Sequence, residues 1–360
     1  MMAETVDLSL NIPASDILEA TLPPELRGTG RDDVRLLVSD RDSGRMSTTH
    51  MRDIARWFRA GDLVVFNRSQ TVPASVVARR GPEGALLRLH IAAVGGRFVA
   101  EPRTPDGRSP HPEGLRVGEE LHVAGSTVGH VLTVGARWHP LLRVWLIEAD
   151  AADAVADAMY AGGSPIRYGY VPVDLPLSAY QTTVGRVPGS AEMPSAGRPF
   201  TRSVLEGLRE KGVELQSITL HTGLSSHEVV GPLEEFPLLP EPTEVGDAVC
   251  RAVARTRDRG GRVVAVGTTV VRALASAPHR GGVPEPFAGV AEAMVTPGHR
   301  PSSVDGLVTG LHAPETSHLA LLEAFLPAAH LRTAYQEALE SRFLWHEFGD
   351  VHLIIPGSAS

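Results

Sequence analysis

Short apolar runs alternate with amphipathic stretches along most of the chain. Continuous runs at Val34 to Val38, Leu63 to Phe66 and Val263 to Val266 predict buried strands. Helices are predicted where apolar positions recur at helical spacing, over Thr49 to Arg59, Ala151 to Tyr160, Arg202 to Lys211, Val245 to Arg259, Val270 to Ala277, Thr316 to Phe325 and Leu331 to Arg342. Strands that alternate with helices are typical of an α/β domain.

The pattern changes between Pro73 and Ile147, where short alternating runs are separated by turn residues. These runs are Leu86 to Ile91, Phe98 to Glu101, Glu120 to Val123, Val128 to Val134 and Leu142 to Ile147. Closely spaced short strands predict a small all-β unit. We therefore expect a discontinuous main α/β domain of residues 1–72 and 161–360, with an all-β domain inserted at 73–160.

Three predicted strands end in groups that suit a ligand. They are Gly267, Thr268 and Thr269 after the first strand, His221 after the second, and Asp305 and His312 on either side of the third. A glycine lets the backbone approach a ligand closely, and the N–H groups that begin the following helix favour anions. Each group also has a purely structural role open to it, as a turn former, a helix cap or a buried histidine. Together they predict one ligand-binding cleft.

Composition limits the classes of protein that fit. The chain has 360 residues, of which 42% are hydrophobic and 21% charged, enough for a sizeable core. The single cysteine, Cys250, excludes an internal disulfide framework and a cysteine-rich metal site. No apolar stretch is long enough for a membrane span, and Met1 to Pro13 lacks the pattern of a secretory signal. We expect a cytoplasmic protein without a bound metal.

The net charge of −8 is unusual for a nucleic-acid partner, because affinity for phosphate backbones comes from clustered Lys and Arg. A local basic face is still compatible with that net charge. Its candidate members are Arg79, Arg80, Arg251, Arg255, Arg257, Arg259 and Arg262. Since Arg251, Arg255 and Arg259 also lie at helical spacing, a solvated helix face is the favoured interpretation.

An ordered set of segments resembles the S-adenosylmethionine:tRNA ribosyltransferase-isomerases of queuosine biosynthesis. The segments are Gly61 to Asn67, Tyr180-Gln181-Thr182, Pro194 to Gly197 with Phe200-Thr201, Thr219-Leu220-His221, Val266 to Thr269 with Arg272, Asp305 to Pro314, and Phe348-Gly349-Asp350. They run in family order from about Arg35 to Ile355. The resemblance therefore covers nearly the whole chain.

The resemblance implies a main domain with a barrel-like sheet, and transfer of the ribosyl part of S-adenosylmethionine to a 7-aminomethyl-7-deazaguanine base in tRNA. S-adenosylmethionine is then a substrate, tRNA a partner, and no cofactor is tightly bound. The implied catalytic residues are His221 and His312 as candidate bases, with Asp305 facing the cation or the ribose. The implied substrate-binding residues are Asn67, Tyr168, Gln181, Thr182, Ser195, Gly197, Glu241, Gly267, Thr268, Thr269 and Arg272.

Some positions depart from the family pattern. The expected His-x-Met-His-x-Glu run is matched by Phe236 to Glu241, which keeps only the acid, and Pro199 and Glu347 stand where a His and a Ser are expected. These departures leave a second hypothesis open, in which the enzyme keeps the donor site but modifies a small-molecule acceptor. A third hypothesis is a non-catalytic binding protein on the same scaffold.

Overall fold

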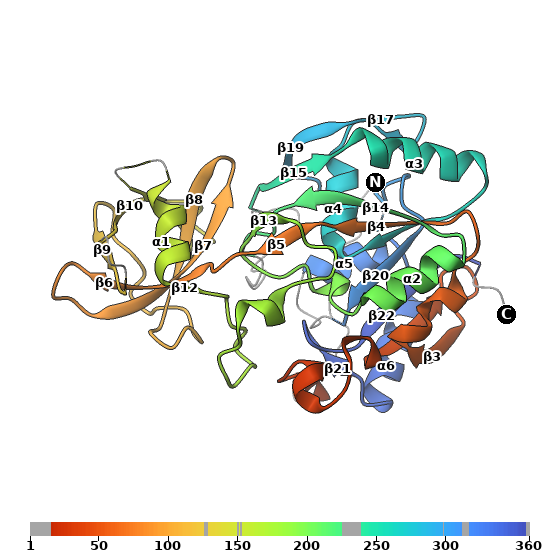
Figure 1. Ribbon diagram of the computed structural model, residues 1–360, viewed down its shortest axis with the longest axis horizontal. Helices are drawn as coiled ribbons and strands as arrows, with labels where there is room; N and C mark the ends of the chain where they lie inside the picture. Colours follow the sequence, from red (N-terminus) through yellow and green to blue (C-terminus); the bar gives the residue numbers. More distant parts are fainter. Residues whose placement is uncertain are drawn as a thin grey trace.

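The computed structural model describes residues 16–125, 129–149, 151, 153–224, 239–297, 299–311 and 317–357. It has a larger and a smaller lobe, which lie at the right and left of Figure 1. The larger lobe is built on a nine-stranded sheet and the smaller on a seven-stranded sheet.

The nine-stranded sheet forms the centre of the larger lobe. In spatial order its strands are β19 (Phe287–Ala291), β15 (Glu241–Val245), β14 (Glu214–Leu220), β4 (Leu63–Asn67), β16 (Val263–Val266), β20 (Gly306–Gly310), β22 (Val351–Ile355), β2 (Arg35–Asp40) and β3 (Met46–His50). The four middle strands β14, β4, β16 and β20 are parallel to one another. Their carboxyl ends therefore meet at one edge of the sheet.

Helices cover both faces of this sheet. They are α2 (Arg202–Glu210), α3 (Asp247–Asp258), α4 (Thr268–Ser276), α5 (Ser317–Glu323) and α6 (Ala328–Glu340). Because successive strand residues point to opposite faces, Val65 and Ala265 pack with α3 and α4, whereas Phe66 and Val264 pack with α2. Both strands are fully buried, as the continuous apolar runs predict.

The helix predicted over Thr49 to Arg59 is shorter and tighter in the structure. Met51–Trp57 form a 3-10 helix, and Thr49 and His50 belong to β3 instead. The reason is tertiary: β3 pairs antiparallel with β2 from Ser39↔Met46 to Arg35↔His50. The Asp40 carboxylate fixes the intervening turn by accepting hydrogen bonds from the amides of Asp42 (3.0 Å) and Ser43 (2.8 Å).

The smaller lobe is a closed antiparallel barrel. Its strands are β6 (Ser75–Arg80), β7 (Leu86–Val94), β8 (Arg97–Arg103), β11 (Trp145–Glu148), β10 (Val131–Arg137) and β9 (Glu120–Val123). The ring closes because β9 pairs with β6 as well as with β10, through Ala78↔Val123 and neighbouring pairs. Buried side chains such as Val76, Leu89 and Leu132 fill its interior. Helix α1 (Ala154–Gly162) follows the barrel, and β12 (Gly163–Ser164) pairs with β6.

The predicted fold class, an α/β domain with a smaller all-β unit, is confirmed. The closed ring, however, lies in the smaller lobe. The nine-stranded sheet ends at β19 and β3, and no pairing joins those two strands in the described part of the chain. A sheet closes when every strand of the ring bonds to two neighbours, and among the described residues the six strands β6, β7, β8, β11, β10 and β9 meet that condition.

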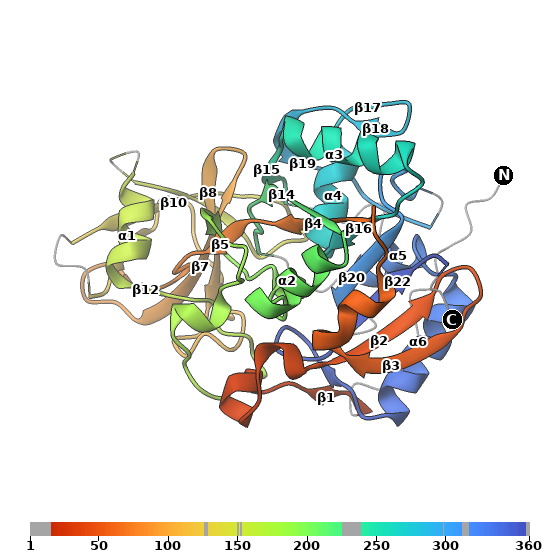
Figure 2. The same cartoon turned by 45° about the vertical axis from the view of Figure 1, so that its right-hand side comes forward.

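The segment that leads from the larger lobe to the barrel forms β5 (Ser69–Thr71), which Figure 2 shows between β4 and the barrel strand β7. It is paired with β13 (Val187–Ser190), which lies beside it in Figure 1 and runs parallel to it, toward the barrel. The remaining short strands are β1 (Leu18–Glu19) with β21 (Leu344–Trp345), and β17 (His279–Arg280) with β18 (Val283–Pro284). The connection between the lobes therefore has its own backbone ladder.

Candidate active site

A cavity of about 530 Å³ opens where the parallel strands of the larger lobe end. Ligands in open α/β sheets bind at this edge, outside the carboxyl ends of the strands. The lining residues are Tyr168, Glu192, Met193, Pro194, Ser195, Ala196, Thr222, Gly267, Thr268, Thr269, Thr309, Gly310 and Glu347. We call this the strand-end cavity.

Gly267 shapes one wall of the strand-end cavity. It has φ of 92°, which favours glycine, and its N–H donates to the Val308 carbonyl at 2.8 Å. A side chain here would start 3.4 Å from Thr269 Oγ1 and 3.5 Å from the Ala196 Cβ. Helix α4 begins directly afterwards, and no side chain at Gly267 caps it. The first turn of α4, with Thr268 and Thr269, is therefore presented to the cavity.

Two buried threonines have hydroxyl groups without a hydrogen-bond partner among the described residues. Thr222 lines the strand-end cavity, and its Oγ1 has no hydrogen-bond partner among the described residues. The same holds for Thr182 Oγ1, which lies behind the cavity against Gly197, where an added Cβ would be 3.5 Å from Thr182 Cγ2. Buried hydroxyl groups are normally hydrogen-bonded, so an unpartnered one that faces a cavity indicates a ligand position.

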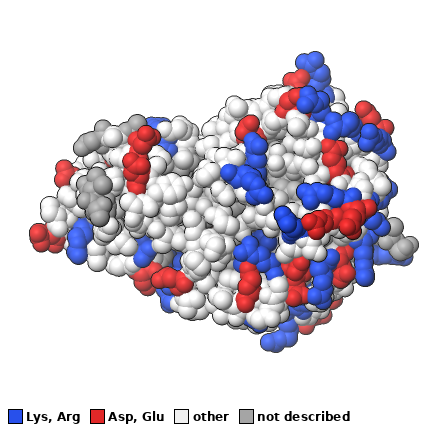
Figure 3. All heavy atoms as spheres, in the orientation of Figure 1, with Lys and Arg blue, Asp and Glu red and all other residues white. Residues whose placement is uncertain are grey.

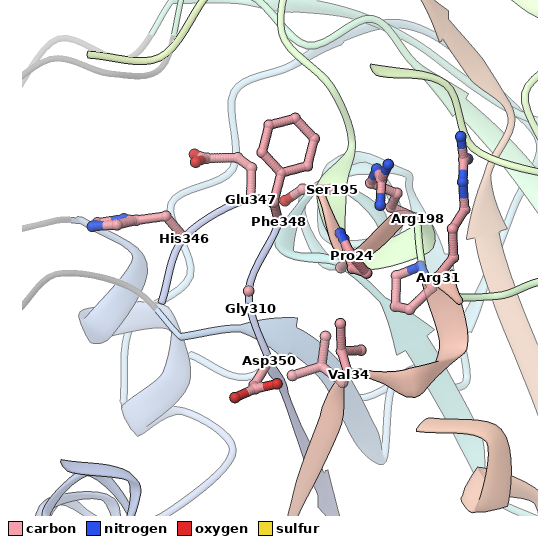
Figure 4. Close-up of a pocket in the computed structure, with 14 residues that line it drawn as sticks. Pro24, Arg31, Val34, Ser195, Arg198, Gly310, His346, Glu347, Phe348 and Asp350 are labelled. Atoms are coloured by element: carbon pink, nitrogen blue, oxygen red, sulfur yellow. The ribbon is translucent and has the colours of Figure 1, made fainter. Parts of the chain in front are cut away.

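A second, smaller hollow adjoins the first and shares Ser195, Ala196, Gly310 and Glu347 with it. Its arginines are held by acids: Arg198 Nη2 donates to both Glu25 carboxylate oxygens at 2.9 Å, and Arg31 Nε donates to Glu25 at 2.5 Å. Figure 4 shows Arg198 and Arg31 on one side of this cavity and Glu347, with His346, on the other. Glu347 is thus placed between the two cavities.

Glu347 is held by a stack of aromatic rings. The ring of Tyr170 stacks between Tyr168 (centroids 5.8 Å apart) and His346 (4.8 Å), and its hydroxyl donates to the Glu347 carboxylate. The N–H of Glu347 donates back to the Tyr170 oxygen at 3.2 Å. Burial raises the pKa of Glu347, and the hydrogen bond from Tyr170 offsets only part of that rise. Burial and the neighbouring carboxylate also raise the pKa of Tyr170.

His221 lies directly after β14, next to the cavity-lining Thr222. Its Nδ1 is 2.8 Å from Ser69 Oγ, which in turn is 2.6 Å from Ser190 Oγ. Burial lowers the pKa of His221, so the imidazole stays neutral at neutral pH. The ring therefore faces the β5–β13 connection, one residue away from the cavity wall.

Four of the predicted binding residues make internal contacts instead of lining a cavity. The Asn67 amide group bridges β4 and β14 by bonding both the carbonyl (2.8 Å) and the N–H (3.1 Å) of Leu220. Gln181 forms the same kind of bracket with the backbone of Thr71, at 2.8 and 3.2 Å. Buried Glu241 pairs with Arg272 and accepts the Gly223 N–H at 2.8 Å. These residues support the cavity from behind.

Asp305 lies at the opposite edge of the sheet. It precedes β20, and its carboxylate accepts the Val263 N–H at 2.9 Å, at the amino end of β16. The length of β20 separates it from Gly310 in the cavity wall, roughly 17 Å at the usual rise per strand residue. His312 lies outside the described residues.

A third hollow, of about 1020 Å³, lies between α2 and β14 and carries basic residues. Arg186, Arg202 and Arg209 line it, with Glu206 as its acid. We call it the arginine groove. Figure 3 shows charged atoms of both signs crowded on the larger lobe, over α2 among other elements, while the middle of this face is largely uncharged.

The arginines that the sequence suggested for a basic face are mostly paired. Arg80 pairs with Glu119, Arg251 with Asp247, Arg255 with Glu214 and Arg262 with Asp62. The favoured sequence interpretation of a solvated helix face fits Arg251 and Arg255, whose side chains are exposed on α3.

Sequence reasoning missed Glu192, Glu347, Thr222 and Thr309 as cavity residues. Thr222 and Thr309 each lie within two residues of a strand end, so the strand-end argument contained the signal. Glu192 and Glu347 lie in irregular segments, and the only sequence signal was that Glu347 stands where the family pattern has a Ser, next to Phe348-Gly349-Asp350.

Two kinds of site are not found in the described ranges. No cluster of three His, Cys, Asp or Glu side chains is arranged to hold a metal ion. No helix is long and apolar enough to cross a membrane. The fold and the cavity define an α/β enzyme that binds a small polar ligand at the carboxyl ends of parallel strands.

Comparison with known proteins gives the family. A family model described as "Queuosine biosynthesis protein" matches residues 7–354. The chain is 32% identical over 387 residues to an S-adenosylmethionine:tRNA ribosyltransferase-isomerase of Sorangium cellulosum, with 98% of each chain covered. It is 32% identical to the enzyme of that name from Thermus thermophilus, over 96% of this chain and 97% of the relative. The chain belongs to the queuosine biosynthesis protein family.

A solved structure agrees with this assignment. The crystal structure of S-adenosylmethionine tRNA ribosyltransferase from Thermotoga maritima matches with a TM-score of 0.51 and 25% sequence identity, over 96% of this chain and 98% of the other. The predicted family resemblance is confirmed.

Proposed function

We propose that this protein transfers and isomerises the ribosyl part of S-adenosylmethionine onto a 7-aminomethyl-7-deazaguanine base in tRNA, giving epoxyqueuosine-tRNA, adenine and methionine. One observation carries the proposal: in a chain that matches ribosyltransferase-isomerases over nearly its whole length, motif residues from separate segments line one cavity. These residues are Tyr168, Ser195, Gly267, Thr268 and Thr269. They come from segments up to about a hundred residues apart, so the fold has to bring them together.

We assign donor binding to the strand-end cavity. Thr268 and Thr269, at the first turn of α4, hold ribose hydroxyl or carboxylate oxygens through hydroxyl and backbone N–H groups. Thr222 adds its unpartnered hydroxyl from the end of β14. Asn67, Gln181, Thr182, Gly197, Glu241 and Arg272 keep the walls in place. Asp305 belongs to the opposite edge and is not part of this assignment.

The reaction also needs a base for the acidified carbon next to the sulfonium sulfur. His221 fits the protonation requirement because burial lowers its pKa and leaves a neutral ring nitrogen. It needs a change of ring orientation to reach the cavity, since Nδ1 contacts Ser69. His312 remains the alternative base from the sequence.

We propose that the arginine groove contacts the tRNA backbone. It supplies three exposed arginines against one glutamate, in a protein whose net charge is −8. Phosphate contacts of this kind provide affinity without sequence information. We also propose that residues 73–160 form an inserted domain between the two parts, 1–72 and 161–360, of the main domain, as the separate sheet and core of the smaller lobe favour.

The test is incubation of the purified protein with S-adenosylmethionine and tRNA that carries the 7-aminomethyl-7-deazaguanine base. Adenine and methionine are expected in equal amounts, in step with formation of the modified nucleoside. Mass spectrometry of digested tRNA and chromatography of the small products measure both. Adenine release with a small acceptor and no change in the tRNA would select the alternative function. The absence of any donor binding would contradict both.

A further inference from the structure

The strand-end cavity is acidic. Its walls include the carboxylates of Glu192 and Glu347 and, in the described chain, no Lys, Arg or His. The adjoining cavity contains Arg31 and Arg198, but Glu25 holds both of them, and Figure 4 shows the Glu347 side chain directed away from them. Glu347 therefore has no cationic side chain beside it among the described residues that line this cavity, and a positively charged ligand would supply a cation.

No positively charged group among the described residues balances the negative charge of the Glu347 carboxylate. The groups that act on its carboxyl are its burial, the Tyr170 hydroxyl, its own backbone N–H and the Glu19 carboxylate, and none of these neighbours in the described structure carries a positive charge. Tyr170 nevertheless fixes its position, through a hydrogen bond in each direction. The carboxylate is thus held in place while its charge is left unbalanced.

The turn that presents Glu347 is itself constrained. His346, the preceding residue, has φ of 71°, a left-handed conformation that non-glycine residues rarely adopt. Its ring stacks on Tyr170 at 4.8 Å, and its carbonyl accepts the Gly349 N–H at 3.0 Å. Such backbone strain persists where surrounding contacts over-determine it, and it is frequent at ligand sites.

We propose that Glu347, positioned by Tyr170, binds the positively charged group of the substrate, with the ring of Tyr168 as a second contact. This inference rests on the proposed function, which brings two cations to the site: the sulfonium of the donor and the protonated aminomethyl group of the acceptor base. A carboxylate beside aromatic rings suits either one, through ionic and cation–π attraction. Glu347 is then a specificity-determining residue and Tyr170 a positioning residue.

The donor arm of the test uses S-adenosylmethionine and its neutral thioether analogue, S-adenosylhomocysteine, measured by isothermal titration calorimetry. Wild type is expected to prefer the sulfonium by about tenfold, and Glu347→Gln by less than about threefold, because Gln keeps the hydrogen bond from Tyr170 but not the charge. Affinity for the neutral analogue stays unchanged. The matched control is Glu148→Gln, at the exposed end of β11 in the barrel, which removes the same charge outside the cavity lining.

The dependence of ligand affinity on pH distinguishes an electrostatic role of Glu347 from a structural one. Since burial raises the pKa of Glu347, its charged form is lost early as pH falls, and sulfonium affinity should fall with it. Binding of the neutral analogue should not. Tyr170→Phe removes a hydrogen bond that favours the charged carboxylate, so the decline should begin at higher pH in this variant. A purely structural role for either residue would shift both ligands equally.

The acceptor arm measures KM for tRNA carrying the 7-aminomethyl base. If Glu347→Gln raises this KM about tenfold while the preference for sulfonium is unchanged, the cation is the acceptor ammonium. If neither quantity changes relative to Glu148→Gln, the inference is overturned although the proposed function stands. If wild type binds neither donor nor analogue, the proposed function itself fails. Circular dichroism at each pH checks that the variants are folded.

Discussion

The two edges of the parallel sheet use polar residues in opposite ways. At the amino edge, Asp62 is fully buried and pairs with Arg262, with Arg262 Nη2 to Asp62 Oδ2 at 2.6 Å, and Asp305 accepts a backbone N–H. At the carboxyl edge, Thr222 has an unpartnered hydroxyl and Glu347 lacks a cation among the described residues. The amino edge satisfies these two acids internally, whereas our proposal assigns Thr222 and Glu347 at the carboxyl edge to a ligand.

This difference teaches that the edge of the sheet decides what an acid does: Glu347 also precedes a strand, β22, but it lies at the carboxyl edge because β22 runs antiparallel to β20. Asp62 and Asp305 precede strands, where the carboxylate reaches the N–H groups that begin a neighbouring strand: Asp62 accepts the Arg262 N–H at 2.9 Å. Residues that follow the strands meet the start of a helix and an open cavity instead. The amino edge should therefore govern stability, and the carboxyl edge should govern binding.

The largest effect is expected at the amino edge, from Asp62→Asn. The substitution keeps the size of the side chain but leaves the buried charge of Arg262 uncompensated, which should lower the free energy of unfolding by about 3 to 5 kcal/mol. Urea unfolding measures it, with Asp258→Asn on exposed α3 as the control. Donor affinity at a temperature where the variant is folded should equal that of wild type. A change no larger than the control would mean that water reaches the pair.

At the carboxyl edge, Thr268→Val should weaken donor binding and leave the stability of the fold largely unchanged. Loss of one hydroxyl in the cavity wall should weaken S-adenosylmethionine binding about tenfold, while the unfolding midpoint changes little. Calorimetric titration measures the donor affinity, and thermal unfolding measures the midpoint. Thr333→Val is the control, since it removes a hydroxyl from α6, where Thr333 bonds only the Ala329 carbonyl (3.0 Å). Equal donor affinity in both variants would assign Thr268 a structural role.

The smallest effect concerns the arginine groove. A double variant, Arg202→Gln with Arg209→Gln, should weaken tRNA binding about fivefold at low salt and reduce the slope of log affinity against log salt by about two. The control removes the same charge on α3, by Arg251→Gln with Arg255→Gln, where Asp247 and Glu214 already pair with the arginines. Fluorescence anisotropy over a salt series measures both. Identical slopes would place the tRNA elsewhere on the surface.

Much of this arrangement was predictable from the sequence because local patterns encode it. The apolar runs before Asn67 and Gly267 specify buried strands, and the Gly-Thr-Thr turn after the second run specifies where α4 begins. The alternating runs after Pro73 likewise specify the strands of the barrel. These features depend on neighbours within a few residues.

The rest depends on contacts between distant segments. The barrel closes between Ala78 and Val123, and Glu347 meets Tyr170 across 177 positions. Asn67 and Glu241 read as site residues in the sequence, yet each finds its partners on a neighbouring strand or helix. Thr49 and His50 are predicted as the start of a helix because their pairing with β2 is not visible locally. Whether a polar residue finds its hydrogen-bond or ion-pair partner within the protein therefore depends on tertiary contacts, which the local sequence does not show.

The paired β5 and β13 have a mechanical consequence. Because β13 pairs with β5, the segment that leads into the barrel is braced by a second strand. The two strands carry Ser69 and Ser190, whose hydroxyls contact each other and, through Ser69, the imidazole of His221. The candidate base of the larger lobe is therefore connected by hydrogen bonds to the segment that leads into the barrel.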